Sequence, residues 1–417
     1  MTRTSITALV PWTLVALVVP SLAMPALADA APLPTATEVA RKAREKGPLT
    51  LLAAAEVKLA GSQKAAAGLP PLTNPYLEVF VDRSKDTSGV AAVQANLWLP
   101  IELAGQRDKR LAEVDGLVAW KKTARAAAAA AAVGEAVTAW GELAVALARR
   151  KEALAGEKIA REESAYVKGR LEAKDATAVD AAVAEGEVAR WLQSKVEADI
   201  TVSTAKARLS IAIGEPTLEA PDDAPVIELP ALPWKDDAAL VAKLDASSPV
   251  LLAAEQEATF FLASKDRWES EKYTPVNFIL SAGRTDLGAF KYGVGLSWSF
   301  PVLRKNQAEI ARADAEADRA KAAKIIATTA LHARAKGAFA AYTAARTALD
   351  TVDTLALPAA QAVVDASVAA WKAGKLEATR VFLARRDLAT ARARRLDVAA
   401  IGYRAYGELA GLIGEVP

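Results

Sequence analysis

The chain contains 417 residues, with 52 Lys and Arg against 50 Asp and Glu, and its formal net charge is +2. This near balance provides no general attraction to nucleic acid, which is therefore excluded as an expected partner. The lack of cysteine and the single histidine exclude disulfides, thiolate catalysis and Cys/His zinc sites, and no cofactor is expected.

The first 28 residues have the pattern of a secretory signal peptide. Arg3 precedes an apolar run at residues 6–19, and Ala26-Leu-Ala28 forms a cleavage site. Pro11 interrupts the run and Pro20 ends it, which argues against the alternative of a membrane-anchoring helix. We expect export, and we expect no later apolar run to be long enough for a spanning helix. A membrane crossing would then have to use strands.

A helix and a β-hairpin are predicted next. Residues 36–67 are typical of a helix, in which Pro48 marks a break or a new start. The stretches at about 75–83 and 89–99 alternate apolar and polar residues, and a short polar turn connects them. Period-two alternation in two arms around a polar turn predicts a hairpin.

Two long helices are predicted after Pro100, one to about residue 153 and one from about residue 156 to 212. Their Ala-rich composition favours helices that pack closely. A fifty-residue helix is roughly 75 Å long, which is more than a compact domain of this size can hold. Such helices are therefore expected to stack lengthwise in a bundle or tube.

The whole pattern recurs about 200 residues later. Leu51-Leu-Ala-Ala54 matches Leu251-Leu-Ala-Ala254, and Trp98 matches Trp298, at an offset of 200. Because one offset holds over most of the chain, we infer a duplicated unit. The predicted organisation is a signal peptide at 1–28, a first repeat at 29–215, a Pro-rich linker at 216–249 and a second repeat at 250–417, with strands at about 275–283 and 290–300.

Four segments, together with the duplication, carry a family resemblance. They are Pro48-Leu-Thr-Leu-Leu-Ala-Ala54, Leu69-Pro-Pro-Leu-Thr-Asn-Pro75, Leu99-Pro-Ile-Glu-Leu-Ala-Gly-Gln-Arg107 and Arg170-Leu-Glu-Ala-Lys-Asp-Ala-Thr-Ala-Val-Asp180. The chain resembles outer-membrane efflux proteins of the TolC type, in particular the CzcC-like branch. The resemblance implies a mainly α-helical protein with a small β-barrel portion, in which a homotrimer completes one 12-stranded barrel on an α-helical periplasmic tunnel. It also implies a passive export duct that works with a periplasmic adaptor protein and an inner-membrane transporter.

Elementary physics also requires the predicted strands to associate. Small closed barrels start near eight strands, and open sheet edges in lipid leave backbone groups unpaired. The residues alone leave open a dimer with eight strands or a trimer with twelve, and the resemblance selects the trimer. The apolar strand faces would then contact outer-membrane lipid. The residues expected to line the water-filled barrel lumen are Glu78, Asp82, Gln94, Asn96, Lys291 and Ser297.

Two kinds of transition are expected along each repeat. Pro100 and Pro301 lack the amide donor that would continue a strand ladder, which predicts the strand-to-helix change there. Two helix tips, at about 168–180 and 372–382, are expected at the periplasmic end. The candidate residues for docking the adaptor at these tips are Leu171, Lys174, Asp175, Gly374 and Leu376. The alternative is that each tip is an ordinary helix–helix turn.

Asp180 and Arg380 occupy matched positions at the two tips and are candidates for the mouth of the pore. The resemblance leads us to expect an acidic residue at such a position, because an acidic ring favours cations, and Arg380 departs from that pattern. Arg380 can either offer positive charge to the pore or face solvent outside the tube.

No constellation of residues predicts catalysis. The lone His332 cannot build a metal site by itself. The basic run at 380–395 is interpreted as a solvated helix face, and Glu162-Glu163 has no nucleophile or Gly-rich loop near it in sequence. We therefore expect no enzymatic activity. The alternative to an export duct is a non-conducting, envelope-spanning helical scaffold, which would not need two hairpins with aromatic apolar faces.

Overall fold

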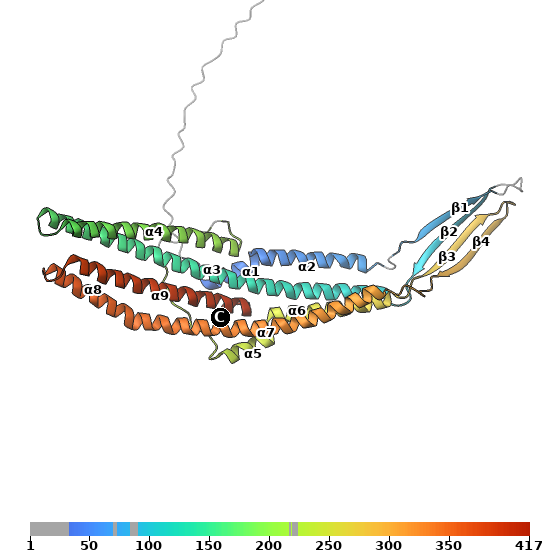
Figure 1. The fold of residues 1–417 in the computed structure, drawn as a ribbon. Coiled ribbons are helices and arrows are strands. Elements are labelled where there is room, and N and C mark those ends of the chain that lie inside the picture. The colour runs from blue at the N-terminus through green and yellow to red at the C-terminus, as the bar shows by residue number, and fades with distance from the viewer. Residues whose placement is uncertain (1–32, 70–72, 84–90, 217, 219–223) are drawn as a thin grey trace, which may run out of the picture.

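The computed structural model describes residues 33–69, 73–83, 91–216, 218 and 224–417. The expected signal peptide with its cleavage site lies outside the described residues, as does the polar turn of the first hairpin. The described part of the chain is an elongated rod (Figure 1). A sheet occupies one end of the rod, and two helix–helix turns lie at the other end.

Both repeats contain the expected order of helix, hairpin and long helices. The elements of the first repeat are α1 (Ala36–Lys46), α2 (Pro48–Ala67), β1 (Tyr76–Asp82), β2 (Ala92–Ile101), α3 (Gln106–Glu172) and α4 (Ala178–Ile213). Those of the second repeat are α5 (Asp237–Ser247), α6 (Pro249–Ser270), β3 (Val276–Arg284), β4 (Phe290–Trp298), α7 (Gln307–Thr351), a π-helical turn (Val352–Ala356), α8 (Leu357–Lys372) and α9 (Ala378–Ile413).

Matched elements agree closely in length and in how they end. α4 and α9 each have 36 residues, and each ends on a left-handed glycine, Gly214 with φ 71° and Gly414 with φ 88°. α1 and α5 each have 11 residues. α5 lies inside the stretch 216–249 that was expected to be a linker, so this stretch also holds the counterpart of α1. The boundaries of the predicted domains stay a prediction.

The expected helix break near residues 153–156 is wrong, because α3 continues through this region as one helix of 67 residues. Gly156 does not interrupt it. The missing side chain instead lets the indole ring of Trp191 lie against α3, since a Cβ at Gly156 would come within 2.4 Å of that ring. The irregularity occurs at the matched place in the second repeat, where the π-helical turn precedes Pro358. Proline has no amide hydrogen for a regular helix and clashes with the preceding turn.

The hydrophobic core lies in the middle of the rod, where α3 packs against α1, α4 and α9. Tyr403 is only 2% exposed, and its hydroxyl donates a hydrogen bond of 2.9 Å to the carbonyl oxygen of Glu228. Gly134 and Gly411 allow α3 and α9 to approach closely, because a Cβ on Gly134 would lie 2.7 Å from the Cα of Gly411. The Ala- and Gly-rich composition therefore serves tight helix contact, as expected.

The sheet is antiparallel throughout, in the order β1-β2-β3-β4. Paired residues in a sheet point to the same side, and successive residues alternate sides. Trp98 pairs with Ile279, whereas Trp298 pairs with Val276, two positions on opposite faces of β3. The two tryptophans that match at an offset of 200 in sequence therefore face opposite sides of the sheet. A shift of one residue is enough to exchange the faces of a strand.

Two helical stretches, Gln106–Glu172 and Gln307–Lys372, are long and apolar enough to cross a membrane by length and composition. The expectation that no such run remains is therefore wrong, because alanine alone makes a helix apolar. This is weak evidence for a membrane span, since the core helix of a soluble bundle passes the same test. In α3, 72% of the most apolar window is buried inside the protein, but in the second stretch only 11% is buried.

Candidate functional site

One face of the sheet is polar and carries all six residues predicted to line a lumen. Glu78 pairs with Asn96, Lys291 pairs with Gly283, and Ser297 pairs with Asn277. Tracing the register across the strands places these rows on the same side as Gln94 and Asp82. The expected lumen face is therefore a single face of the sheet.

Hydrogen bonds link the polar side chains of the first hairpin. The Glu78 carboxylate accepts from the indole Nε1 of Trp98 at 3.2 Å and from the Asn96 amide at 3.5 Å. The Gln94 amide donates to Asn96 Oδ1 at 3.0 Å, and the Tyr76 ring stacks on Trp98 with 5.3 Å between centroids. These contacts fix a band of polar and aromatic groups on one side of β1 and β2.

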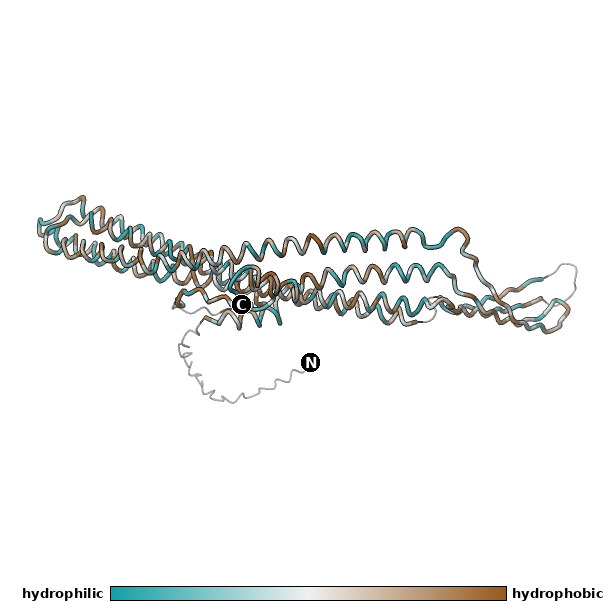
Figure 2. The backbone as a smooth tube through the Cα atoms, turned by 90° about the horizontal axis from the view of Figure 1, so that it is seen from below, coloured by the Kyte–Doolittle hydropathy of each residue, from teal (hydrophilic) through white to brown (hydrophobic). Residues whose placement is uncertain are grey.

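The opposite face of the sheet is apolar and exposed. On β4, Tyr292 is 88% exposed, and Val294 and Leu296 are each 74% exposed. Leu77 and Val79 of β1 continue this face and are 65% and 55% exposed. Figure 2 shows that the strands at this end of the rod carry both hydrophobic residues, in brown, and hydrophilic residues, in teal. A sheet with one polar and one exposed apolar face separates water from lipid or from another apolar surface.

The strand-to-helix changes occur close to Pro100 and Pro301 but do not begin at them. Pro100 still belongs to β2, which continues to Ile101, whereas Pro301 follows the end of β4 at Trp298. Each long helix starts several residues later, at Gln106 and Gln307.

The same local backbone arrangement precedes each of the two long helices. Gly105 and Asn306, just before the two helices, have left-handed φ values of 67° and 55°. The side-chain oxygen of Gln106 accepts from the amide of Ala104 at 2.9 Å, and that of Gln307 accepts from Lys305 at 2.8 Å. Sequence reasoning missed this device, although the two glutamines, 201 residues apart, could have indicated it.

The two tips are built on the same backbone turn. Lys174 and Gly374 have left-handed φ values of 63° and 70°. The amide of Asp175 donates to the carbonyl of Arg170 at 2.8 Å, and the amide of Lys375 donates to that of Ala370 at 2.9 Å. These bonds close each helix with a Schellman turn. A lysine in this conformation is strained relative to glycine, because its Cβ approaches the following carbonyl.

The chemistry of the following helix start differs between the tips. The Thr177 hydroxyl accepts from the amide of Asp180 at 3.1 Å, and the Asp180 carboxylate accepts from the amide of Thr177 at 3.0 Å. This capping box holds the Asp180 carboxylate at the helix start, and these hydrogen bonds from Thr177 keep its pKa below the ordinary value. At the second tip, Glu377 makes no side-chain cap, and Arg380 is exposed.

A small hydrophobic cluster supports both tips. Trp371 is 6% exposed, and Phe382 is 5% exposed. The ring of Trp371 meets that of Tyr166 edge-on, with 5.0 Å between centroids. Leu376 packs against this cluster, so its side chain supports the turn. Leu171 is 36% exposed, and Lys174, Asp175 and Gly374 are also exposed.

Arginines of α9 bind α9 to α3 and α4. Arg385 lies 2.8 Å from Glu163, Arg386 lies 2.9 Å from Glu187, and Arg392 lies 3.0 Å from Glu152. Burial raises the pKa of Glu163, and the nearby Arg385 opposes that rise. The interpretation of the basic run as a solvated face therefore needs correction for Arg385, which is partly buried in its ion pair, while Arg386 and Arg392 stay substantially exposed. Sequence analysis could not place their partners, which are about 200 residues away.

His332 pairs with Asp245 of α5, with 2.6 Å between Nε2 and Oδ1. In the part of the chain that the structure describes, no group of three His, Cys, Asp or Glu residues could hold a metal ion. The pair connects α5 to α7, so its geometry supports a structural role for His332.

Known proteins resemble the chain over nearly its whole length. No family model matches it. The cobalt-zinc-cadmium resistance protein CzcC of Cupriavidus metallidurans is 23% identical over 382 residues, which cover 88% of this chain and 90% of that protein.

Solved structures of outer-membrane channels share the fold. The outer-membrane channel OprN has a TM-score of 0.73 at 18% identity, covering 91% of this chain and 90% of that one. The open state of the MtrE outer membrane channel of Neisseria gonorrhoeae has a TM-score of 0.69 at 16% identity, covering 92% and 89%. The arrangement of a four-stranded sheet on long paired helices is therefore one that known channels adopt.

Proposed function

We propose that this chain, whose fold is that of the TolC-type outer-membrane efflux channels, is the outer-membrane component of a tripartite efflux system. Three copies form a passive duct, with strands in the outer membrane and helices in the periplasm. The duct works with a periplasmic adaptor and an inner-membrane transporter and performs no catalysis itself. The observation that carries this proposal is the two-faced sheet with open edges at the end of a helical rod.

The sheet edges support assembly into a closed barrel. Within the described residues, β1 and β4 each pair with a strand on one side only. Because the strands alternate in direction, β4 of one copy runs antiparallel to β1 of a neighbouring copy. The same kind of ladder that joins β2 to β3 can therefore join the copies. Three sheets of four strands close a 12-stranded barrel and leave no edge in lipid.

The helices support the same assembly. α3 packs between α2 and α6, but its counterpart α7 packs against α6 and lacks a second neighbour of this kind among the described elements. Because the repeats alternate around a closed tube, the second neighbour of α7 would be α2 of another copy. Ile325 and Ile326 on α7 are 69% and 68% exposed, and Leu52 on α2 is 63% exposed. Joining α7 to a neighbouring α2 would bury these side chains and complete the wall of the tube.

The sheet faces then acquire distinct roles. The apolar face, including Tyr292 and Leu296, would contact lipid, and the polar face around Glu78 and Asn96 would line water. A non-conducting scaffold gives no reason for a polar face opposite an exposed apolar one. Asp180 and Arg380 stay candidates for the periplasmic mouth of this duct.

The tips would dock the adaptor. Leu171 and Val179 are exposed apolar side chains at the first tip, 36% and 70% exposed, beside Lys174 and Asp175. Leu171→Asp should abolish efflux of the transported compound and leave assembly intact, because it lies far from the sheet. The matched substitution Leu376→Asp is expected to damage the tip itself, since Leu376 packs on the tip core. Normal efflux by Leu171→Asp, with the protein shown to be present, would contradict docking at this tip.

The proposed function is tested by reconstitution. Detergent-extracted protein should sediment as a trimer in analytical ultracentrifugation and should conduct ions when inserted into a planar bilayer. A trimer that inserts but never conducts would favour the scaffold. A protein that stays monomeric in detergent would contradict the assembly itself.

A further inference from the structure

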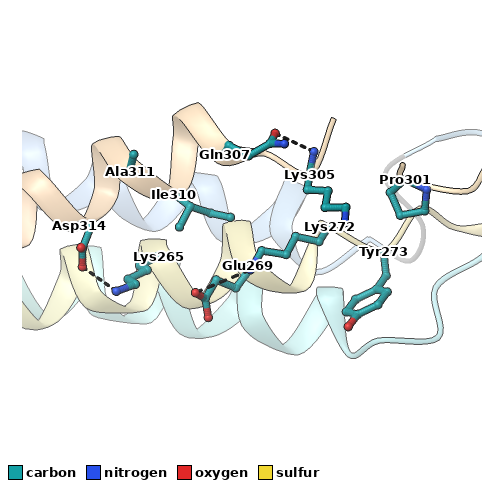
Figure 3. Close-up of a pocket in the computed structure, with 10 residues that line it drawn as sticks. All are labelled: Lys265, Glu269, Lys272, Tyr273, Pro301, Lys305, Gln307, Ile310, Ala311 and Asp314. Carbon is teal, nitrogen blue, oxygen red and sulfur yellow. Dashed lines mark hydrogen bonds and ion pairs between the residues drawn. The ribbon is translucent and has the colours of Figure 1, made fainter. Parts of the chain in front are cut away.

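A cavity of about 700 Å³ lies where the sheet meets the helices, between the end of α6 and the start of α7. Figure 3 shows the Lys272 side chain extending toward Glu269, and the Lys305 side chain between α7 and α6. Neither the proposed duct nor the docking tips use this cavity.

The charges around the cavity do not balance locally. Lys265 lies 2.6 Å from Asp314, so these two opposite charges compensate each other. Lys272 lies 3.9 Å from Glu269, which is a loose contact between two exposed side chains. The Lys305 ammonium has no ion pair in the part of the chain that is described. Of these two lysines, one is loosely held by a carboxylate and the other has no ion pair, which favours an anion beside them.

An exposed apolar stretch follows β4 on both sides of Pro301, which lines the cavity. It contains Phe300, Val302 and Leu303, which are 70%, 73% and 85% exposed. The rings of Trp298 and Phe300 lie 4.4 Å apart at its start. Aromatic and apolar side chains followed directly by lysines are typical of the headgroup level of a membrane.

The matched place in the first repeat holds its basic side chains differently, since Arg107 donates to the carbonyl of Gly68 and Lys109 pairs with Asp266. There Arg110 pairs with Glu102 at 2.8 Å, and the two side chains are only 4% and 8% exposed. Leu103 is 74% exposed, so an apolar side chain is present there too. Its charged neighbours Glu102 and Arg110, however, form a buried ion pair. Lys272 and Lys305 therefore belong to the second repeat alone, because the sequence has Leu72 and Ala104 at the matched positions.

We propose that this cavity binds the phosphate group of an anionic phospholipid from the periplasmic leaflet of the outer membrane. Lys272 and Lys305 contact the phosphate, and the acyl chains lie along Phe300, Val302 and Leu303. The proposal rests on the proposed function, because it needs the apolar face of the sheet to lie in lipid. It gives the second repeat a lipid contact that holds the barrel at a fixed depth.

The test is phospholipid binding by the detergent-solubilised protein in three arms. The probes are phosphatidylglycerol, phosphatidylcholine and glycerol 3-phosphate, and the variant is Lys272→Gln with Lys305→Gln. Each lysine contributes about fivefold to binding at an anionic membrane surface, so the variant should bind phosphatidylglycerol roughly 25-fold more weakly. The matched control is Lys58→Gln with Lys336→Gln, two exposed lysines on α2 and α7 that do not line the cavity. This control should bind like the unaltered protein.

Two results would overturn the lipid site. One is equal binding of phosphatidylglycerol by the variant and the unaltered protein. The other is equal affinity for glycerol 3-phosphate and phosphatidylglycerol, which would make the cavity an anion site without a lipid. Trimer formation and conductance are measured on the same samples. Conducting trimers with unchanged lipid binding refute the lipid site alone, whereas the absence of trimers refutes the proposed function.

Discussion

The two repeats of this chain have the same order of elements but different side-chain chemistry at their matched positions. Both tips close with a left-handed residue, yet one uses Lys174 and the other Gly374. Only the first tip has a capping box, between Thr177 and Asp180. What the repeats share is therefore mainly backbone geometry, while caps, ion pairs and surface charge have diverged.

The middle of the long helices differs in the same way. α3 is one continuous helix, but the second repeat has a π-helical turn before Pro358. At this turn Asp353 accepts from Arg395 of α9 at 2.6 Å. The second repeat thus has an irregular turn that is tied to α9, at a place where the first repeat continues as a regular helix.

The largest expected effect tests whether the two hairpins share one lipid face. Leu97→Arg in the first repeat and Leu296→Arg in the second should each cost about 2–4 kcal/mol near the bilayer midplane. Both leucines lie on the apolar side of the sheet. Ser297→Arg, on the polar side, should cost far less. Reversible unfolding in lipid measures all three, and equal losses at positions 296 and 297 would contradict the assigned faces.

The next effect separates the caps of the two tips. Thr177→Ala should destabilise the first tip by about 1 kcal/mol, because it removes the hydroxyl of the capping box. Glu377→Ala should have almost no effect, since Glu377 makes no side-chain cap. Hydrogen exchange of the amides at each helix start reports this difference. Equal changes in protection at both tips would show that the box contributes nothing.

The capping box also predicts a pH dependence of the first tip. The pKa of Asp180 is lowered from 3.8 by hydrogen bonds from Thr177. The stability that this group contributes is therefore fully present above pH 3.8 and is lost as the pH falls through the lower folded value. Thr177→Ala should weaken this acid sensitivity, because it removes the hydroxyl that donates to the carboxylate, whereas the amide of residue 177 still donates. A first tip that responds to acid identically with and without Thr177 would contradict this assignment.

The smallest effect concerns the left-handed residue of each turn. Lys174→Gly should stabilise the first tip by at most about 1 kcal/mol, because glycine adopts positive φ without strain. Gly374→Ala should destabilise the second tip by a similar amount. Thermal unfolding of the two variants checks the signs, which should be opposite. Stabilisation by both substitutions would mean that the turns do not require this conformation.

The sequence alone predicted the duplication, the hairpins and the polar face of the sheet, because periodicity and repeated spacing are local signals. It did not predict the continuity of α3 past Gly156, because a glycine that makes room for Trp191 looks the same as one that ends a helix. The ion pairs of Arg385 and Arg386 could not be predicted either, since their partners are set by helix packing.

The central claim is that β4 of one copy pairs with β1 of the next, and disulfide trapping tests it most directly. If this junction repeats the pairing of Leu97 with Leu280, and if matched positions are shifted by one residue so that the apolar side chains keep one face, Leu296 should lie opposite Val79 of a neighbouring copy. The chain has no cysteine of its own, so Val79→Cys combined in turn with Val294→Cys, Leu296→Cys or Trp298→Cys gives an unambiguous readout. We predict a covalent trimer on a denaturing gel for the 79/296 pair and not for either single substitution. A conducting protein in which none of the three pairs cross-links between copies would contradict the barrel.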